Sequence, residues 1–148
     1  MNVESSIKTK KKMSLDTRTI IHLSLVNSKL NEAMNNALKP FDVSLQQFNV
    51  LRILKGQNGI PANLCTLNER MVTKMSNTTR LVDKLIGKTF VNKRTCPTNR
   101  RKIEISITPK GDCFLKEMSK AIKTAETKIL ENFTKQELEE LNQLLDKF

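Results

Sequence analysis

The sequence has few of the residues from which metal centres and disulfide frameworks are built. Its 148 residues include three cysteines and one histidine, and no two cysteines form a Cys-x-x-Cys pair. A structural zinc site needs four nitrogen or sulfur ligands, and a disulfide framework needs an even number of cysteines. The sequence therefore argues against both, and we expect the protein to bind no metal and no cofactor.

Long apolar runs are also missing. No stretch approaches the roughly 18 apolar residues of a membrane-spanning helix, and residues 1–13 carry cations without the apolar core of a signal peptide. With 38% hydrophobic and 28% charged residues, the chain has the composition of one soluble globular domain. We expect a cytoplasmic protein with no membrane partner.

Motifs of catalysis are absent as well. The chain has no nucleophile elbow, no phosphate-binding loop and no metal-spaced histidines, and its acidic residues are dispersed. We therefore expect no enzymatic activity.

Acidic residues are almost absent from one block of the chain. Residues 70–102 hold ten cations and one acid, Asp83, so this block carries +9 of the formal net charge of +11. A solvated surface does not need such polarisation, whereas contact with nucleic acid does. Residues 1–13 carry a further +3, and their arm from Lys8 to Lys12 either follows a phosphate backbone or is a disordered tail.

Apolar periodicity predicts six helices. The predicted segments are 14–39, 45–55, a short helix ending near Val72, a helix beginning at Ser76, and two that start after Thr108 and Thr134. Ser44 and Thr134 each begin a capping box, and Pro109 suits a first helical position. The short helix could start after Asn63 or after Thr66. The buried positions expected in the helix from Ser76 are Thr78, Leu81, Val82, Leu85 and Ile86.

A β-hairpin is predicted between the fourth and fifth helices. Phe90 and Val91 favour a strand, and three isoleucines between 103 and 107 alternate with polar residues. The segment 96–99 between them predicts a loop too long for a two-residue turn. The three cations at 100–102 would then project at its tip.

Two short helices followed by a hairpin form a winged helix-turn-helix, a fold that binds duplex DNA. One helix can enter the major groove while the hairpin reaches phosphates or the adjacent minor groove. The narrow minor groove concentrates negative potential and attracts arginine, which explains why Arg100 and Arg101 stand together.

The sequence resembles the MarR (multiple antibiotic resistance regulator) family. The resemblance rests on five motifs: Leu67-Asn-Glu-Arg-Met71, Ser76-Asn-Thr-Thr-Arg-Leu-Val-Asp-Lys-Leu85, Phe90-Val-Asn-Lys-Arg94, Asn99-Arg-Arg101 and Ile107-Thr-Pro-Lys-Gly111. It implies a mainly α fold with a small β-hairpin wing, in which one domain spans 1–148. Residues 44–108 would form the winged-helix DNA-binding lobe, and a homodimer would form through 14–39 and 109–148. The resemblance also implies a repressor that binds a pseudo-palindromic operator in double-stranded DNA and is released by a small-molecule effector or an oxidant.

The resemblance also assigns the DNA-binding residues. They are Ser76, Asn77, Thr78, Arg80 and Lys84 in the recognition helix, and Asn99, Arg100, Arg101 and Lys102 in the wing. Two positions depart from the family pattern, because Asn99 replaces an acidic residue and Thr89 replaces the glycine before the first wing strand. The oxidant-sensing branch has a cysteine near the start of its first helix, and this chain has none there.

Several readings stay open at this point. Arg80 and Lys84 could instead belong to an ordinary solvated helix face. Cys96 lies in a cationic segment that could stabilise a thiolate and give redox sensitivity, or it is an ordinary loop thiol. Cys65 and Cys113 are expected to pack among apolar neighbours. Two rival functions remain, a sequence-neutral nucleoid or RNA-binding protein and a protein-interaction module.

Overall fold

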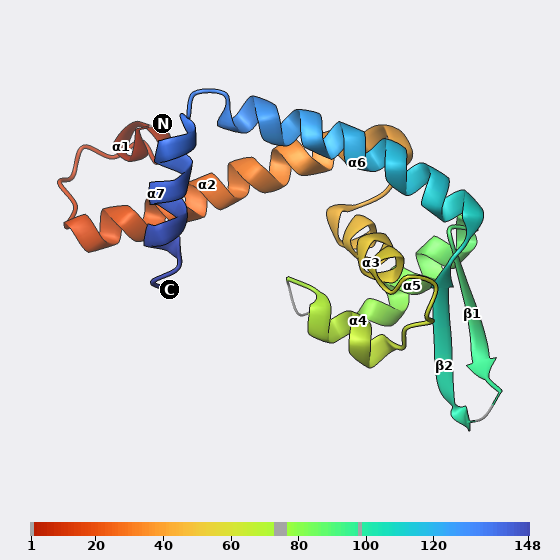
Figure 1. Ribbon diagram of the computed structural model, residues 1–148. Helices are drawn as coiled ribbons and strands as arrows, with labels where there is room; N and C mark the ends of the chain where they lie inside the picture. The colour runs from red at the N-terminus through yellow and green to blue at the C-terminus, as the bar shows by residue number, and fades with distance from the viewer. Residues whose placement is uncertain (1, 73–76, 98) are drawn as a thin grey trace.

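Two long helices lie side by side, and a compact lobe is joined to one end of the pair (Figure 1). The computed structural model describes residues 2–72, 77–97 and 99–148, with the backbone alone at 99–101. The elements, in chain order, are α1 (Val3–Ser6), α2 (Leu15–Leu38), η1 (Lys39–Phe41), α3 (Leu45–Gly56), α4 (Leu64–Arg70), α5 (Thr78–Gly87), β1 (Val91–Cys96), β2 (Asn99–Ile107), α6 (Pro109–Leu130) and α7 (Lys135–Leu145). Within the described ranges, no helix is both long enough and apolar enough to cross a bilayer.

Side-chain caps fix where the helices begin, as the sequence predicts. The Ser44 hydroxyl accepts from the Gln47 N–H while the Gln47 amide oxygen accepts from the Ser44 N–H, and a second capping box opens α7. Thr108 caps α6, with Pro109 at its first position. Asn63 caps α4, which settles the start of that helix in favour of the earlier residue.

The arm before α2 is partly folded. Residues 3–6 form a helix that packs on α2, with Val3 fully buried and Glu4 paired to Arg18 at 2.8 Å. Residues 3–6 therefore form part of the packed structure, ahead of the arm from Lys8 to Lys12. The lysines that follow are exposed, at positions 8, 10, 11 and 12.

The lobe has an apolar core to which every one of its elements contributes. Leu51 of α3, Leu85 of α5 and Ile105 of β2 are fully buried. Ile105 also exchanges backbone hydrogen bonds with Ala62, at 2.9 and 2.7 Å, which ties the hairpin to the segment before α4. The core continues into α6 through Leu115, Met118 and Ile122, so the lobe and the long helices share one apolar interior.

The hairpin differs from its prediction, because its strands extend to Cys96 and Asn99. Thr95 pairs with Ile103 and Cys96 with Asn99, so the three cations at 100–102 lie on the β2 side of a bulge. The long loop expected at 96–99 was therefore wrong. Sequence alternation stops at Ile103, but the bulge inserts extra residues into one strand and allows pairing to resume.

The start of α6 lies against the carbonyl that precedes β1. A Cβ on Gly111 would stand 2.1 Å from the Phe90 carbonyl oxygen and 3.0 Å from Ile107 Cγ1. The same Phe90 oxygen accepts a hydrogen bond from the Thr108 N–H at 3.0 Å. Only glycine lets the helix approach the wing base this closely.

Replacing Gly111 with Ala should lower the free energy of unfolding by about 2–3 kcal/mol, because backbone rather than a flexible side chain must move. Gly87→Ala is the matched control, since nothing lies within 4 Å of a Cβ there. It should stabilise the protein by about 0.5–1 kcal/mol. Urea unfolding at fixed protein concentration measures both. Equal stability of Gly111→Ala and the wild type would contradict the close approach.

The C-terminal helix leaves its apolar face uncovered in the single chain. None of the described residues of α7 is buried, although leucines recur on one face as predicted. Exposure is 58% at Leu144 and 88% at Phe148. The amino-terminal half of α2 is similarly open, with Leu15 and Ile20 exposed.

Candidate nucleic-acid interface

Helix α5 has one buried face and one cationic face. Leu81, Val82 and Leu85 are buried as predicted, and Ile86 is half-buried. Arg80 and Lys84, one turn apart, are exposed on the opposite side. Within the described part of the chain, neither has an acidic group within 4.0 Å.

The amino-terminal end of α5 is held against α4. Thr78 is 2% exposed, and its hydroxyl hydrogen-bonds the Asn68 amide oxygen. Its side chain therefore does not reach the surface that a DNA contact requires, and we assign it to positioning α5. Asn77 precedes it and is exposed, whereas Ser76 lies outside the described residues.

One exposed residue of α5 was missed in the sequence. Thr79 lies beside Arg80 at the edge of the solvent-facing side. A helical wheel centred on the buried leucines would have placed Thr79 next to Arg80 on the exposed side, because neighbouring residues of a helix are 100° apart. Its hydroxyl can donate to or accept from a base edge.

The wing carries cations of two kinds. Lys93 pairs with Asp83 at 3.6 Å and Arg94 with Glu104 at 2.7 Å, so these two charges are matched. The Arg94 guanidinium lowers the pKa of the Glu104 carboxyl. Lys102 is exposed, and no ion pair of it occurs among the described residues. The backbone of Asn99, Arg100 and Arg101 runs in β2, but their side chains lie outside the described structure.

The junction between α5 and the wing is a tight left-handed turn. Thr89 has φ of 62°, and its N–H donates to the Ile86 carbonyl while the Phe90 N–H donates to that of Leu85. This pair of bonds is a Schellman motif, whose left-handed position usually holds glycine. Thr89 therefore adopts the left-handed conformation although it is not a glycine, and the turn is formed.

Helix α6 holds this junction from the other side. The Thr108 hydroxyl donates to the Thr89 carbonyl at 2.8 Å. Lys110 donates to the Thr89 hydroxyl at 2.8 Å and to the Lys88 carbonyl at 3.2 Å. Lys88 in turn pairs with Asp42 at 2.5 Å, beyond the end of α2. Helix α6 and the segment that follows η1 therefore both contact the carboxyl-terminal end of α5.

Thr89→Gly should raise the free energy of unfolding by about 0.5–1 kcal/mol. Relief of a left-handed β-branched residue outweighs the added chain entropy of glycine. Thr127→Gly, at an exposed position inside α6, is the control and should lower stability by about 0.4 kcal/mol. Thermal and urea unfolding test the pair. Destabilisation by Thr89→Gly would show that the hydroxyl contacts matter more than the backbone strain.

The three thiols lie in different settings from those expected. Cys65 and Cys113 are exposed, so the expectation that they pack was wrong. Glu69 accepts a hydrogen bond from Cys65 and raises the pKa of this thiol. Cys96 is half-buried and hydrogen-bonds Glu104. The described residues contain no group of three or more potential metal ligands.

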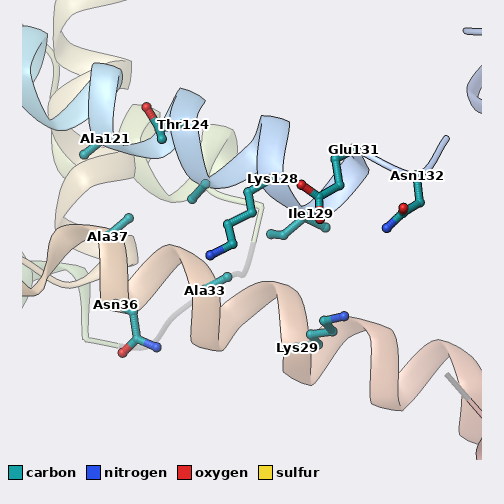
Figure 2. A pocket seen from close by; sticks show the side chains of 11 residues that line it. Lys29, Ala33, Asn36, Ala37, Ala121, Thr124, Lys128, Ile129, Glu131 and Asn132 are labelled. Atoms are coloured by element: carbon teal, nitrogen blue, oxygen red, sulfur yellow. The ribbon is translucent and has the colours of Figure 1, made fainter. Parts of the chain in front are cut away.

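A hollow of about 680 Å³ lies between α2 and α6, away from α5 and the wing. Four alanines line it, at positions 33, 37, 121 and 125, together with two lysines. Figure 2 shows Lys128 reaching from α6 toward Ala33 of α2, with Lys29 further along the same helix. Its size falls within the range of small-molecule sites.

Comparison with known proteins gives consistent matches. Residues 43–103 match the model of the MarR family. The chain is 27% identical over 139 residues to the transcriptional repressor MprA of Escherichia coli, covering 86% of this chain and 77% of MprA. It is 25% identical over 124 residues to the multiple antibiotic resistance protein MarR of Salmonella typhimurium, covering 83% and 85% of the two chains.

Solved structures share the fold. A MarR-like transcription regulator from Bacillus cereus has a TM-score of 0.81 at 23% identity, with 90% and 96% of the two chains covered. A cysteine-to-serine variant of Escherichia coli MarR complexed with operator DNA has a TM-score of 0.76 at 23% identity, with 90% and 93% covered. CouR from Rhodococcus jostii bound to p-coumaroyl-CoA has the same TM-score and coverage at 22% identity. The predicted fold, mainly α with a β-hairpin wing, is confirmed.

Proposed function

We propose, from the match of residues 43–103 to the MarR family model, that the chain is a MarR-family homodimeric repressor that binds a pseudo-palindromic operator in double-stranded DNA. Helix α5 enters the major groove, and the wing follows the adjacent backbone or minor groove. Asn77, Thr79, Arg80 and Lys84 supply contacts from the helix. Asn99, Arg100, Arg101 and Lys102 supply those from the wing, and Ser76 contributes at the start of the helix.

One observation carries the proposal. Arg80 and Lys84 on the exposed face of α5, and Lys102 in β2, have no ion pair among the described residues, whereas Lys93 and Arg94 of the same block are paired with acids. Like charges that lack acidic partners favour a polyanion. The operator-bound relative has the same fold, which supports duplex DNA over other polyanions.

The long helices and α7 provide the dimer interface in this proposal. Their exposed apolar residues need a partner surface, and a second copy has the matching surface. Two lobes related by two-fold symmetry would present their recognition helices about 34–36 Å apart, one turn of duplex. An asymmetric or single-lobed arrangement would read only half of a palindrome.

Binding to duplex DNA from upstream of the protein's own gene, measured against a shuffled duplex across a salt series, tests the function. Preference for the native duplex by about a thousandfold or more is expected of a specific regulator. Equal affinity for the two duplexes would instead support a sequence-neutral protein.

Arg101→Ala should weaken operator binding by about 1–3 kcal/mol and leave the dimer folded. Lys123→Ala is the control, since this lysine is exposed on α6 away from the lobe. Fluorescence anisotropy gives the affinity and size-exclusion chromatography the oligomeric state. Unchanged affinity of Arg101→Ala would reject the wing assignment, and a partner bound independently of the wing would favour a protein-interaction module.

We further propose that a small organic anion with an apolar body releases the DNA from the hollow between α2 and α6. The alanines leave space for an apolar group, and Lys29 and Lys128 outnumber the one acid, Glu131, that lines the hollow. The hollow separates two helices that hold the lobe, so a bound ligand can favour a different lobe spacing. CouR, which shares the fold, is bound to an aromatic acyl-CoA.

Benzoate and p-coumarate are suitable first probes, and at millimolar concentration at least one should weaken operator binding. Ala33→Phe should abolish this effect because the ring fills the hollow, while Ala33→Ser keeps the space and should respond normally. Operator anisotropy with each variant is the measurement. An equal response of Ala33→Phe and the wild type would place the effector elsewhere.

A further inference from the structure

A second, smaller hollow lies on the lobe between α3 and the end of α4. It measures about 250 Å³ and is lined by Asn49, Arg52 and Ile53 from α3 and by Arg70 and Val72 from the end of α4. Its described charged residues are both arginines. We name it the two-arginine hollow.

The two arginines are exposed and have no acidic partner within 4.0 Å among the described residues. The Arg52 guanidinium lies 5.8 Å from the centroid of the Phe48 ring, so a cation–π contact with the buried core helps to place it. Glu69, the acid next to Arg70 in sequence, accepts the hydrogen bond of Cys65. Among the described residues, no acid lines the hollow.

Ordinary explanations account for each arginine separately. Arg70 lies in the last turn of α4, where the helix dipole favours a cation, and Arg52 gains from its aromatic neighbour. Neither effect explains why two guanidinium groups border the same small space. Two guanidinium groups and an amide side chain form a set of donors that suits the oxygens of one phosphate.

The place of the hollow in the fold identifies the source of that phosphate. Helix α4 is the first helix of the helix-turn-helix, and six residues separate Arg70 from Asn77 at the start of the recognition helix. In this motif the first helix crosses the DNA backbone while the second enters the groove. We propose that Arg52 and Arg70 together bind a backbone phosphate of the operator, beside the contacts of α5 and the wing.

The proposal rests on the function inferred above and extends it. A phosphate contact carries no sequence information, because it fixes the position and orientation of the lobe on the duplex. The contact therefore contributes the same binding free energy with the native duplex as with the shuffled duplex. It should also steepen the salt dependence, since each phosphate neutralised releases counterions.

The double variant Arg52→Gln with Arg70→Gln tests the inference. Its affinity for both duplexes should fall by a similar factor, about tenfold, and the slope of log K against log salt should become shallower by about 1. Lys116→Gln with Lys123→Gln, on the exposed face of α6, removes the same net charge away from the hollow and should change neither quantity appreciably. Arg52→Lys with Arg70→Lys should keep the wild-type slope and lose part of the affinity, because the charges remain and the bidentate geometry does not.

Each outcome decides a different point. The Arg52→Gln, Arg70→Gln variant could instead show the same affinity and salt slope as the Lys116→Gln, Lys123→Gln control, with its preference for the native duplex intact. That result would overturn the two-arginine contact and leave the proposed function standing. Failure of the wild-type protein to bind either duplex would overturn both. Titration of the wild-type protein with inorganic phosphate, followed through the NMR signals of the arginine Nε–H groups, distinguishes a free phosphate ion from a DNA phosphate as the ligand. The wild-type protein could bind free phosphate while the Arg52→Gln, Arg70→Gln variant binds DNA with unchanged affinity. These two results together would assign the hollow to a free anion and overturn the operator contact.

Discussion

The approach of α6 to the Phe90 carbonyl is the constraint on which the rest of the structure depends. At this point the chain leaves the recognition helix, enters the wing and returns to begin the longest helix of the carboxyl-terminal half. Gly111 permits the contact, and Thr108 supplies its hydrogen bonds. Because one small region joins three elements, a displacement of α6 moves α5 and the hairpin together.

The same junction explains how a signal from the long helices can reach the DNA-binding face. Lys110 of α6 holds Thr89 and Lys88, and Asp42 holds Lys88 from the end of α2. Polar contacts therefore join α6, and the segment that follows η1, to the carboxyl-terminal end of α5. Regulation through geometry requires such a connection, and flexible linkers would not supply it.

The sequence predicted where helices begin better than it predicted the contacts between helices and strands. The starts of α3, α6 and α7 were correct because the caps at Ser44, Thr108 and Thr134 are local interactions, complete within four residues. Helix α5, predicted from Ser76, begins at Thr78 and its N-cap residue makes no side-chain hydrogen bond. The extended wing was missed because its bulge depends on pairing between strands, which no local pattern encodes. Thr78 was placed on the DNA-binding face as well as in the core, and only the contact with Asn68 from another helix settles its role.

The candidate sites also divide into those that local sequence patterns predict and those that depend on contacts between distant residues. The charge block, the recognition helix and the wing cations were visible in the sequence because charge and helical period are local properties. The two-arginine hollow was not visible, since Arg52 and Arg70 are eighteen residues apart and meet only when α3 packs on α4. Similarly, the settings of Cys65 and Cys113 depend on which helix faces remain open after folding.

The uncovered face of α7 connects stability to function. This helix has 11 residues and no buried side chain among them, and an isolated helix shorter than about 12–15 residues is marginal in water. Its order must therefore come from burial against another surface, and the open face of α2 on a second copy supplies one of matching apolar character. The contacts that make α7 stable would then be the contacts that set the distance between the two lobes. In such a dimer, the helix that depends on its partner for burial also determines whether two recognition helices meet successive major grooves.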